Sequence, residues 1–214
     1  MNKEQYLENL RVLKNEYPKW NAPVVTLIAI HSNDPFKILI STILSLRTKD
    51  EVTSIASERL FEIADSADKL AKLDSEIIEK LIYPVGFYKR KAIQIKQICI
   101  EIIDNYGGNV PDNLNDLLKF KGVGRKTANL VLSLGFKIPA ICVDVHVHRI
   151  SNRFGFVETK TPEETEFVLM GKLPKSNWND INDLLVAFGQ TICRPVSPKC
   201  ILCPLKFCKF GGKF

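Results

Sequence analysis

Residues 117–149 read LLKFKGVGRKTANLVLSLGFKIPAICVDVHVHR, and this stretch decides the fold that we expect for the chain. A glycine-spaced turn at residues 122–124 is followed directly by two cations, Arg125 and Lys126, and by a helix-like segment that leads to Asp144. Glycines permit a tight reversal and keep Cβ atoms away from the backbone N–H groups. N–H groups at the start of a helix, together with the helix dipole, form a site for a phosphate oxygen. On its own a G-x-G turn is a weak signal, because most such turns are only connections.

Outward from this stretch, apolar residues recur at helical spacing, and no segment combines period-two alternation with a hairpin turn. Local signals mark several helix ends: Asp34 with Pro35 as N-cap and first-turn proline, residues 107–108 as a glycine stop, and a capping box from Thr161 to Glu164. We expect helices over residues 3–16, 35–45, 50–63, 68–73, 75–81, 88–106, 114–119, 125–134, 144–153, 161–170 and 178–192, with an irregular segment over 18–33. The helix at 50–63 is expected to bury Val52, Ile55, Ala56 and Leu60. The fold class is therefore all-α.

Composition sets wider limits. The 214 residues are 45% hydrophobic, which is enough for one substantial core or two small ones, and the net charge is +6. That charge fits either plain solubility or a polyanionic partner such as a phosphate backbone. No apolar run approaches the roughly 18–20 residues of a membrane span, and the N-terminus lacks the apolar core of a secretion signal. We therefore expect a soluble protein without a membrane partner, located in the cytoplasm at the nucleoid if the source is prokaryotic.

The six cysteines do not resemble a disulfide framework. Cys99 and Cys142 stand alone in apolar surroundings, so we expect buried thiols there. The other four cluster near the C-terminus with the spacing C-x6-C-x2-C-x4-C and are Cys193, Cys200, Cys203 and Cys208. In a chain without a secretion signal, such clustering indicates a metal site, and the spacing alone fits either zinc or a [4Fe–4S] cluster.

A family resemblance follows from these motifs. LKFKGVGRKTA resembles the helix-hairpin-helix element of DNA repair glycosylases, and GVGRKTAN followed by VDVHVHR is similar to the endonuclease III family. DPFKILISTILSLRTKDE, VGFYKRKAIQIKQIC and the terminal cysteines occur in that family's order, so the resemblance covers about residues 5–208. It implies two helical domains with a DNA-binding cleft between them. Residues 24–135 would hold the helix-hairpin-helix motif, and residues 1–23 plus 136–214 would form a discontinuous domain with an iron–sulfur cluster loop.

The resemblance also implies a reaction. Lys126 would be the nucleophile and Asp144 the catalytic carboxylate of a bifunctional DNA glycosylase and abasic-site (AP) lyase, which excises oxidised pyrimidines of the thymine glycol type in base excision repair. A lysine amine can attack C1′ and form a Schiff base that permits β-elimination, and a carboxylate can stabilise the charge on the sugar. The helix start and Arg125 disfavour the ammonium form of Lys126, whereas a close Asp144 favours it. We expect the amine to have a lowered pKa or to be deprotonated by Asp144. Without the resemblance, these residues would be a surface cation and a helix N-cap.

Duplex opening needs groups that fill the space of the extruded base. Arg47, where relatives often carry glutamine, lies in a turn between two expected helices, and Phe87 follows Gly86 in another. Phe87 would act as an apolar wedge, and its alternative role is a buried aromatic in a helix-capping turn. The other expected DNA contacts are Gly122, Val123, Gly124, Arg125, His146, Arg194 and Lys199.

For the four clustered cysteines, the resemblance favours a [4Fe–4S] cluster, although the family's last gap is usually five residues and here it is four. The expected partner is double-stranded DNA with damaged bases or abasic sites, bound by a monomer. Two alternatives remain open. One is a mismatch glycosylase for uracil or thymine opposite guanine, or for adenine opposite oxidised guanine, although such relatives generally lack a lysine at position 126. The other is a non-catalytic DNA-binding iron–sulfur module.

Overall fold

The computed structural model describes residues 1–212, and over that range it is helical without a β-strand, as expected. Two compact units are present, Met1–Pro23 together with the chain from Pro139 onward, and Val24–Ile138. We call these the discontinuous unit and the central unit. Among the described residues, no helix is long and apolar enough to span a membrane.

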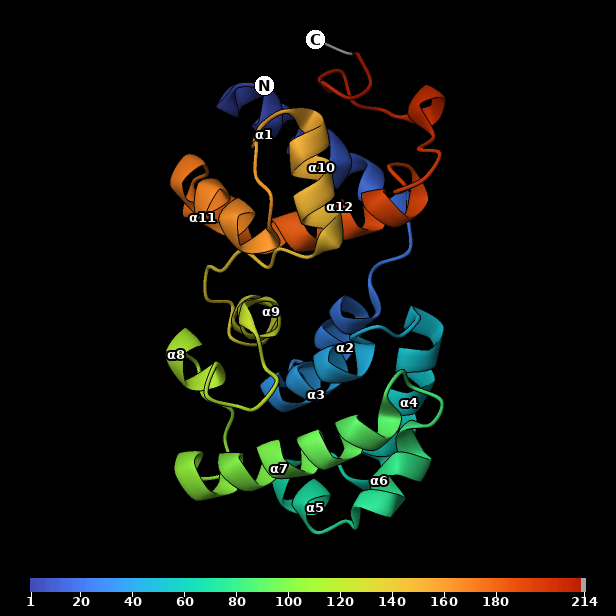
Figure 1. Cartoon of the computed structure of the whole chain (residues 1–214), viewed down its shortest axis with the longest axis vertical. Coiled ribbons are helices and arrows are strands. Elements are labelled where there is room, and N and C mark those ends of the chain that lie inside the picture. Colours follow the sequence, from blue (N-terminus) through green and yellow to red (C-terminus); the bar gives the residue numbers. More distant parts are fainter. Residues whose placement is uncertain (213–214) are drawn as a thin grey trace. The chain divides into compact units, whose positions relative to one another are not determined.

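The central unit is built around α3 (Pro35–Ser45), which packs against α2 (Val24–Ser32), α4 (Asp50–Ile63), α7 (Tyr88–Tyr106) and α9 (Arg125–Gly135) (Figure 1). Every α3 residue from Phe36 to Leu44 except Lys37 is buried, because a helix that is apolar on nearly all sides is stable only in a core. α5 (Ala67–Ala71) and α6 (Ser75–Ile82) pack along α7, and α8 (Leu114–Leu117) precedes α9. The core helix thus supports both the start of α7 and the body of α9.

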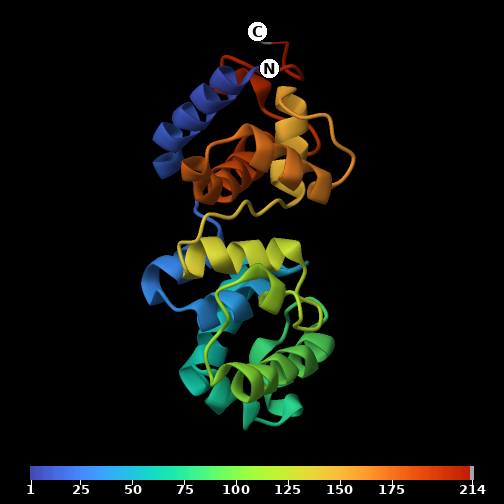
Figure 2. The same ribbon diagram turned by 90° about the vertical axis from the view of Figure 1, so that its left-hand side faces the viewer.

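The discontinuous unit places the N-terminal helix α1 (Lys3–Glu16) against α12 (Trp178–Thr191), with α10 (Val145–Phe154) on α12 and α11 (Pro162–Lys172) on α10 (Figures 1 and 2). Short 3-10 turns lie at Tyr17–Lys19, Lys175–Asn177 and Cys200–Leu202. Aromatic rings join these helices: the Tyr6 ring stacks on Phe156 with centroids 4.1 Å apart and meets Phe154 edge-on at 6.0 Å. The two ends of the chain therefore share one core.

Side-chain caps set many of the helix ends, as the sequence predicts. Asp34 Oδ1 accepts the N–H of Phe36 at 2.9 Å, and Gly107 ends α7 in the left-handed conformation. Thr161 Oγ1 accepts the N–H of Glu164 at 3.1 Å. The Glu164 carboxylate accepts the N–H of Lys160 instead of that of Thr161, so only the first half of the expected capping box is present. Local hydrogen bonds and a left-handed glycine therefore mark these boundaries.

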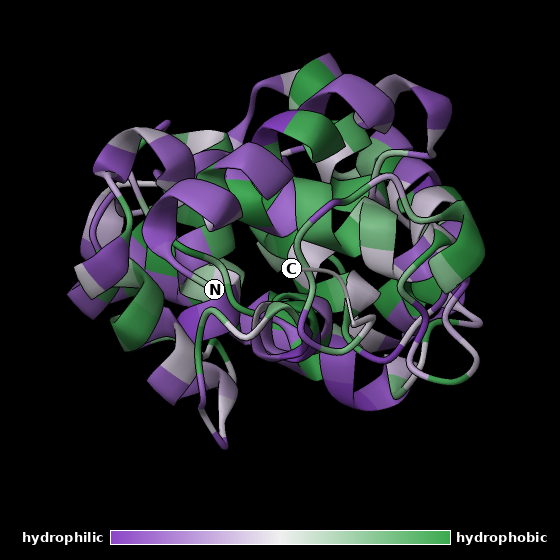
Figure 3. Ribbon diagram, turned by 90° about the horizontal axis from the view of Figure 1, so that it is seen from above, coloured by the Kyte–Doolittle hydropathy of each residue, from purple (hydrophilic) through white to green (hydrophobic). Residues whose placement is uncertain are grey.

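Two expectations about helices are wrong. The segment at 18–33, expected to be irregular, contains α2, whose sequence VVTLIAIHS is apolar on all sides and so shows no helical stripe. In α4 the inward face is rotated: Ile55 is 56% exposed, and the small polar residues Thr53 and Ser57 are buried beside Ala56. Hydrophobic and hydrophilic residues are mixed along the ribbons of the helices (Figure 3). Packing against neighbouring helices, rather than periodicity, decided both features.

Candidate functional site

The glycine turn joins α8 to α9 as the expected helix-hairpin-helix motif. Gly122 has a φ of +80°, which favours glycine, and a Cβ there would lie 2.6 Å from the side-chain nitrogen of Gln94. That nitrogen instead donates to the carbonyl oxygen of Lys121 at 2.9 Å, so α7 holds the turn from below. Gly124 is the N-cap of α9 in extended conformation, and a Cβ there would meet nothing within 4 Å. The turn therefore keeps open space at the positive end of the α9 dipole.

Val123 lies between the two glycines of the turn. Its side chain is 5% exposed, and its N–H donates to the carbonyl oxygen of Phe120 at 3.0 Å. The Val123 side chain therefore packs beneath the turn, and the expected contact of this residue with DNA stays a prediction. Gly122 and Gly124 on either side of it are exposed.

Lys126 and Arg125 occupy the first turn of α9 and are half-buried. The next residues, Thr127 and Ala128, are buried, and α9 packs against α3. Packing thus fixes the helical phase of α9 and, with it, the direction of the first-turn cations.

Asp144 is the N-cap of α10 in the discontinuous unit. Its Oδ1 accepts the N–H groups of His146 at 2.8 Å and Val147 at 2.9 Å. Both of these hydrogen bonds end on Oδ1. The helix cap therefore fixes the orientation of the carboxylate without using all of its acceptor capacity.

The histidines beside Asp144 have different surroundings. Nδ1 of His146 lies 3.1 Å from an Arg149 guanidinium nitrogen, and this guanidinium also donates to the carbonyl oxygen of Cys193 at 3.0 Å. Nδ1 of His148 lies 2.7 Å from the hydroxyl of Thr165 on α11. His148 therefore joins two helices, whereas half-buried His146 stands at the α10 start beside Asp144.

The structure brings Arg47 and Phe87 together. The Arg47 guanidinium carbon lies 5.8 Å from the centre of the Phe87 ring, within the range of a cation–π contact. Both residues have left-handed backbones, with φ of +55° and +59°, which is uncommon outside glycine. Phe87 is 56% exposed, which contradicts the alternative of a buried aromatic in a capping turn.

The four clustered cysteines lie after α12, and none of them forms a disulfide. Cys193 is buried in the core of the discontinuous unit, and its Sγ accepts a hydrogen bond from the Arg153 guanidinium at 3.4 Å. Burial raises the pKa of the Cys208 thiol, whose sulfur accepts the N–H of Gly211 at 3.4 Å. Within residues 1–212, no group of three or more histidine, cysteine or acidic side chains is arranged to hold a metal ion. The donor set of four thiols with N–H groups aimed at sulfur fits an iron–sulfur cluster in its chemistry. Cys99 and Cys142 are buried, as predicted.

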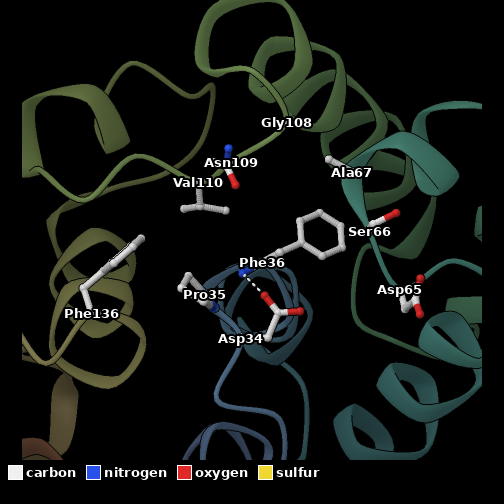
Figure 4. A pocket seen from close by; sticks show the side chains of 10 residues that line it. All are labelled: Asp34, Pro35, Phe36, Asp65, Ser66, Ala67, Gly108, Asn109, Val110 and Phe136. Atoms are coloured by element: carbon white, nitrogen blue, oxygen red, sulfur yellow. Dashed lines mark hydrogen bonds between the residues drawn. The ribbon is translucent and has the colours of Figure 1, made fainter.

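A separate cavity of about 240 Å³ lies in the central unit, where the start of α3 meets residues 65–67, residues 108–110 and Phe136 (Figure 4). It contains no residue of the glycine turn. Asp34 uses its carboxylate to cap α3, and Asp65 pairs with Lys69 at 2.9 Å, which lowers the pKa of Asp65. The carboxylates at its edge disfavour a phosphate there.

Comparison with known proteins agrees with this geometry. Residues 40–175 match the HhH-GPD superfamily of base excision DNA repair proteins, a range that includes the Arg47 turn, the hairpin and Asp144. The chain belongs to this superfamily. It is 53% identical over 178 residues to Endonuclease III of Thermotoga maritima, a match that covers 83% of this chain and 84% of that protein. The four clustered cysteines lie after residue 175, where the match to the superfamily ends.

Solved structures of this superfamily share the fold over nearly the whole chain. A trapped covalent intermediate of endonuclease III with DNA matches with a TM-score of 0.88 and 35% identity, over 99% of this chain and 97% of that one. A thermostable thymine-DNA glycosylase matches with a TM-score of 0.83 and 27% identity, over 98% and 96%. The superfamily fold therefore extends over the cysteine segment as well as the hairpin.

The sequence had not singled out the contacts beneath these turns. Lys91 and Gln94 on α7 donate to backbone oxygens of the Arg47 turn and of the glycine turn. Their only signal in the sequence is a cation and an amide three residues apart on one helix.

Proposed function

We propose that this chain is a bifunctional DNA glycosylase and AP lyase that excises oxidised pyrimidines of the thymine glycol type. The observation that carries the proposal is a lysine, Lys126, in the first turn of the helix that follows the glycine turn of a base excision repair fold. A primary amine at that place supplies a nucleophile, and mismatch-specific relatives generally lack a lysine there. The solved endonuclease III structure trapped as a covalent intermediate with DNA supports an attack of this type.

The proposed chemistry begins with nucleophilic attack. The neutral amine of Lys126 attacks C1′ of the damaged nucleotide, and the bond between C1′ and the base breaks with its electron pair on the departing base, which takes up a proton. Oδ2 of Asp144 stabilises the positive charge that develops on the sugar and accepts a proton from the attacking nitrogen. The bond between C1′ and O4′ then breaks as the nitrogen lone pair forms a Schiff base with C1′, and O4′ takes up the proton held by Asp144.

Strand cleavage follows from the Schiff base. Loss of a proton from C2′ sends electrons toward the iminium nitrogen, and the bond between C3′ and its phosphate oxygen breaks by β-elimination. Water then hydrolyses the imine and returns Lys126 as a free amine. In this proposal, Lys126 and Asp144 act on the same nucleotide.

DNA is held, in this proposal, by the exposed glycines of the hairpin, by Arg125 and by the cations of the cysteine segment, Arg194 and Lys199. A phosphate at the α9 start gains from the helix dipole, and side-chain cations add a salt-dependent attraction. His146 stands next to Asp144 and is the proposed contact on that side. Arg47 and Phe87 enter the duplex, where Phe87 fills the space left by the extruded base and Arg47 meets the orphaned partner base.

A [4Fe–4S] cluster is the proposed cofactor, held by Cys193, Cys200, Cys203 and Cys208. With all four positions taken by thiolates, the cluster would supply a structural link, and hydrolysis would not involve it. The Arg153 guanidinium and the N–H of Gly211 are positioned to donate to two of the ligand sulfurs. The cluster would thereby fix the segment that carries Arg194 and Lys199.

Single-turnover cleavage of defined duplexes tests the proposed function. Duplexes that contain thymine glycol, dihydrouracil or an abasic site are incubated with the protein, with and without borohydride. We expect strand cleavage of all three and a borohydride-stable protein–DNA adduct. Excision without strand cleavage, or no reaction on any duplex, would overturn the lyase assignment.

A mismatch glycosylase is the second candidate, favoured by the likeness to the solved thymine-DNA glycosylase. It is separated from the first candidate by a duplex with thymine opposite guanine. Excision from this duplex at a rate above that for thymine glycol, with alkali needed for strand cleavage, would support the second candidate. The presence of Lys126 leads us to expect the opposite order.

A further inference from the structure

Among the residues that the structure describes, Lys91 on α7 is the one lysine with a buried side chain, 6% exposed. Its Nζ donates to the carbonyl oxygens of Leu44 at 2.8 Å and Leu46 at 2.6 Å, and to the hydroxyl of Thr48 at 3.3 Å. An ammonium group has three N–H donors and here meets three oxygens. No carboxylate of the described residues pairs with it.

These oxygens lie at the C-terminal end of the core helix α3 and in the turn that follows it. The last carbonyl groups of a helix have no partner within the helix and carry partial negative charge. Lys91 supplies the missing donors from 47 positions away in the sequence. Burial lowers the pKa of Lys91 to about 8, so its charge is held at a cost. A buried charge is a poor source of net stability, and its better attested role is to fix one geometry.

The same contacts join the Arg47 turn to the Phe87 turn. The Thr48 hydroxyl, which Lys91 contacts, also accepts the N–H of Gly86 at 3.1 Å. A Cβ on Gly86 would lie 2.5 Å from the carbonyl oxygen of Arg47, so only glycine permits this approach of the two backbones. Lys91 itself lies one helical turn after Phe87, and its N–H donates to the Phe87 carbonyl oxygen at 3.0 Å. Lys91 therefore contacts both the Arg47 turn and the Phe87 turn.

We propose that Lys91 is a positioning residue, whose ammonium group fixes the Arg47 turn against the Phe87 turn in the geometry that base extrusion requires. This inference rests on the proposed function, because it assigns the two turns to duplex opening. Arg47 and Phe87 both have left-handed backbones, which persist only where the surrounding structure enforces them. The contacts of Lys91 supply such a constraint to the backbone of both turns, through its ammonium group at residues 44–48 and through its N–H at Phe87.

The neighbouring contact of Gln94 supports this role for α7. Gln94 lies three residues after Lys91, so the two side chains are neighbours on the helix surface. Its amide donates to the Lys121 carbonyl oxygen in the glycine turn. The first half of α7 thus contacts the Arg47 turn, the Phe87 turn and the glycine turn.

The test compares Lys91→Met with Lys96→Met, a matched loss of one lysine charge on the same helix. Thr48→Val is a second variant, which removes the shared hydroxyl and keeps the side-chain shape. Each variant is assayed under single-turnover conditions on a thymine glycol duplex and on an abasic duplex. A 2-aminopurine opposite the lesion reports unstacking of the partner base in a Lys126→Ala background, where cleavage is absent.

We expect Lys91→Met to slow thymine glycol excision about 10-fold to 100-fold, because small displacements of positioned groups have effects of this size. Abasic cleavage should fall less than about 3-fold, since no base remains to be extruded. The 2-aminopurine signal should fall, Thr48→Val should act in the same direction, and the double variant should be less than additive because the two residues share one contact. Lys96→Met should resemble the unmodified protein.

Amide hydrogen exchange gives a readout that does not depend on activity. In Lys91→Met, faster exchange confined to residues 44–49 and 84–88 is expected, whereas faster exchange throughout the central unit would show a general structural role and overturn the inference. Equal losses on both duplexes, or no loss on either, would also overturn it while leaving the proposed function intact. An unmodified protein that cleaves neither duplex would overturn the proposed function and the inference together. If Lys91→Met does not fold, the Thr48→Val results alone decide.

Discussion

At the scale of single residues, the two proposed catalytic groups owe their positions to helix starts. Lys126 stands in the first turn of α9, whose buried face sets its direction, and Asp144 is the N-cap of α10. Both elements are recognisable in the sequence from a glycine turn and from an acid before a periodic segment. The division of labour within the Asp144 carboxylate is not, because only the structure shows that both cap bonds end on Oδ1.

Lys126→Ala should abolish the borohydride-stable adduct with abasic DNA, since no other primary amine is proposed to reach C1′. The measurement is gel detection of the adduct, with Lys80→Ala on the exposed side of α6 as the control that should retain it. An adduct of normal yield in Lys126→Ala would show that a different amine is the nucleophile.

Asp144→Asn and Asp144→Ala should separate catalysis from capping. Asparagine can still accept the N–H groups of the α10 start, so thermal unfolding should be unchanged, whereas alanine should cost about 1 kcal/mol of stability. Both variants lose the negative charge, so base excision should fall about 100-fold or more in each. Wild-type excision by Asp144→Asn at matched protein concentration would contradict the role of the carboxylate.

At the scale of elements, the two glycines of the hairpin meet different structural requirements. Gly122 needs its left-handed φ and the space beside Gln94, whereas Gly124 caps α9 in an ordinary extended conformation. The sequence predicts the turn and its two helices but cannot separate these requirements, because Gln94 lies 27 residues from the Lys121 carbonyl it contacts.

Gly122→Ala should therefore lower the free energy of unfolding by about 1–2 kcal/mol, through the positive φ and the displaced Gln94. Gly124→Ala should change it by less than about 0.5 kcal/mol, because the weaker N-cap is offset by a stiffer unfolded chain. Both variants should bind abasic DNA more weakly, since each adds a Cβ to the exposed turn. Urea unfolding and DNA titration at fixed salt provide the measurements, and equal stability losses in the two variants would refute this assignment.

At the scale of the whole molecule, the N-terminal helix packs with the C-terminal part of the chain in the discontinuous unit. α1 shares a core with α10 and α12, and the side-chain amide of Asn9 donates to the Phe207 carbonyl oxygen at 2.8 Å. Arg153 donates to the carbonyl oxygens of Arg194 at 2.6 Å and Pro195 at 2.8 Å, so α10 also holds the cysteine segment. Cys193 belongs to that core, whereas Cys208 is only partly buried and packs against it.

Cys208→Ser should consequently remove bound iron and the visible absorption of the purified protein while the far-ultraviolet helical signal persists. DNA binding should weaken, because the segment with Arg194 and Lys199 loses its link. Cys99→Ala, a change in the core of the central unit, is the control that should retain iron. Full iron content in Cys208→Ser, or zinc in place of iron in the unmodified protein, would contradict the proposed cluster.

The sequence by itself determined the helical fold class, most helix boundaries and the places of Lys126 and Asp144 at helix starts. Those features depend on caps, glycines and periodicity, which act over a few residues. The tertiary structure decided that 24–32 is helical, that α4 turns Ile55 outward, that Val123 packs beneath its turn, and that Arg47 meets Phe87. It also decided that Lys91 closes the end of α3. Each of these depends on side chains packed from other parts of the chain, and local sequence patterns do not encode such contacts.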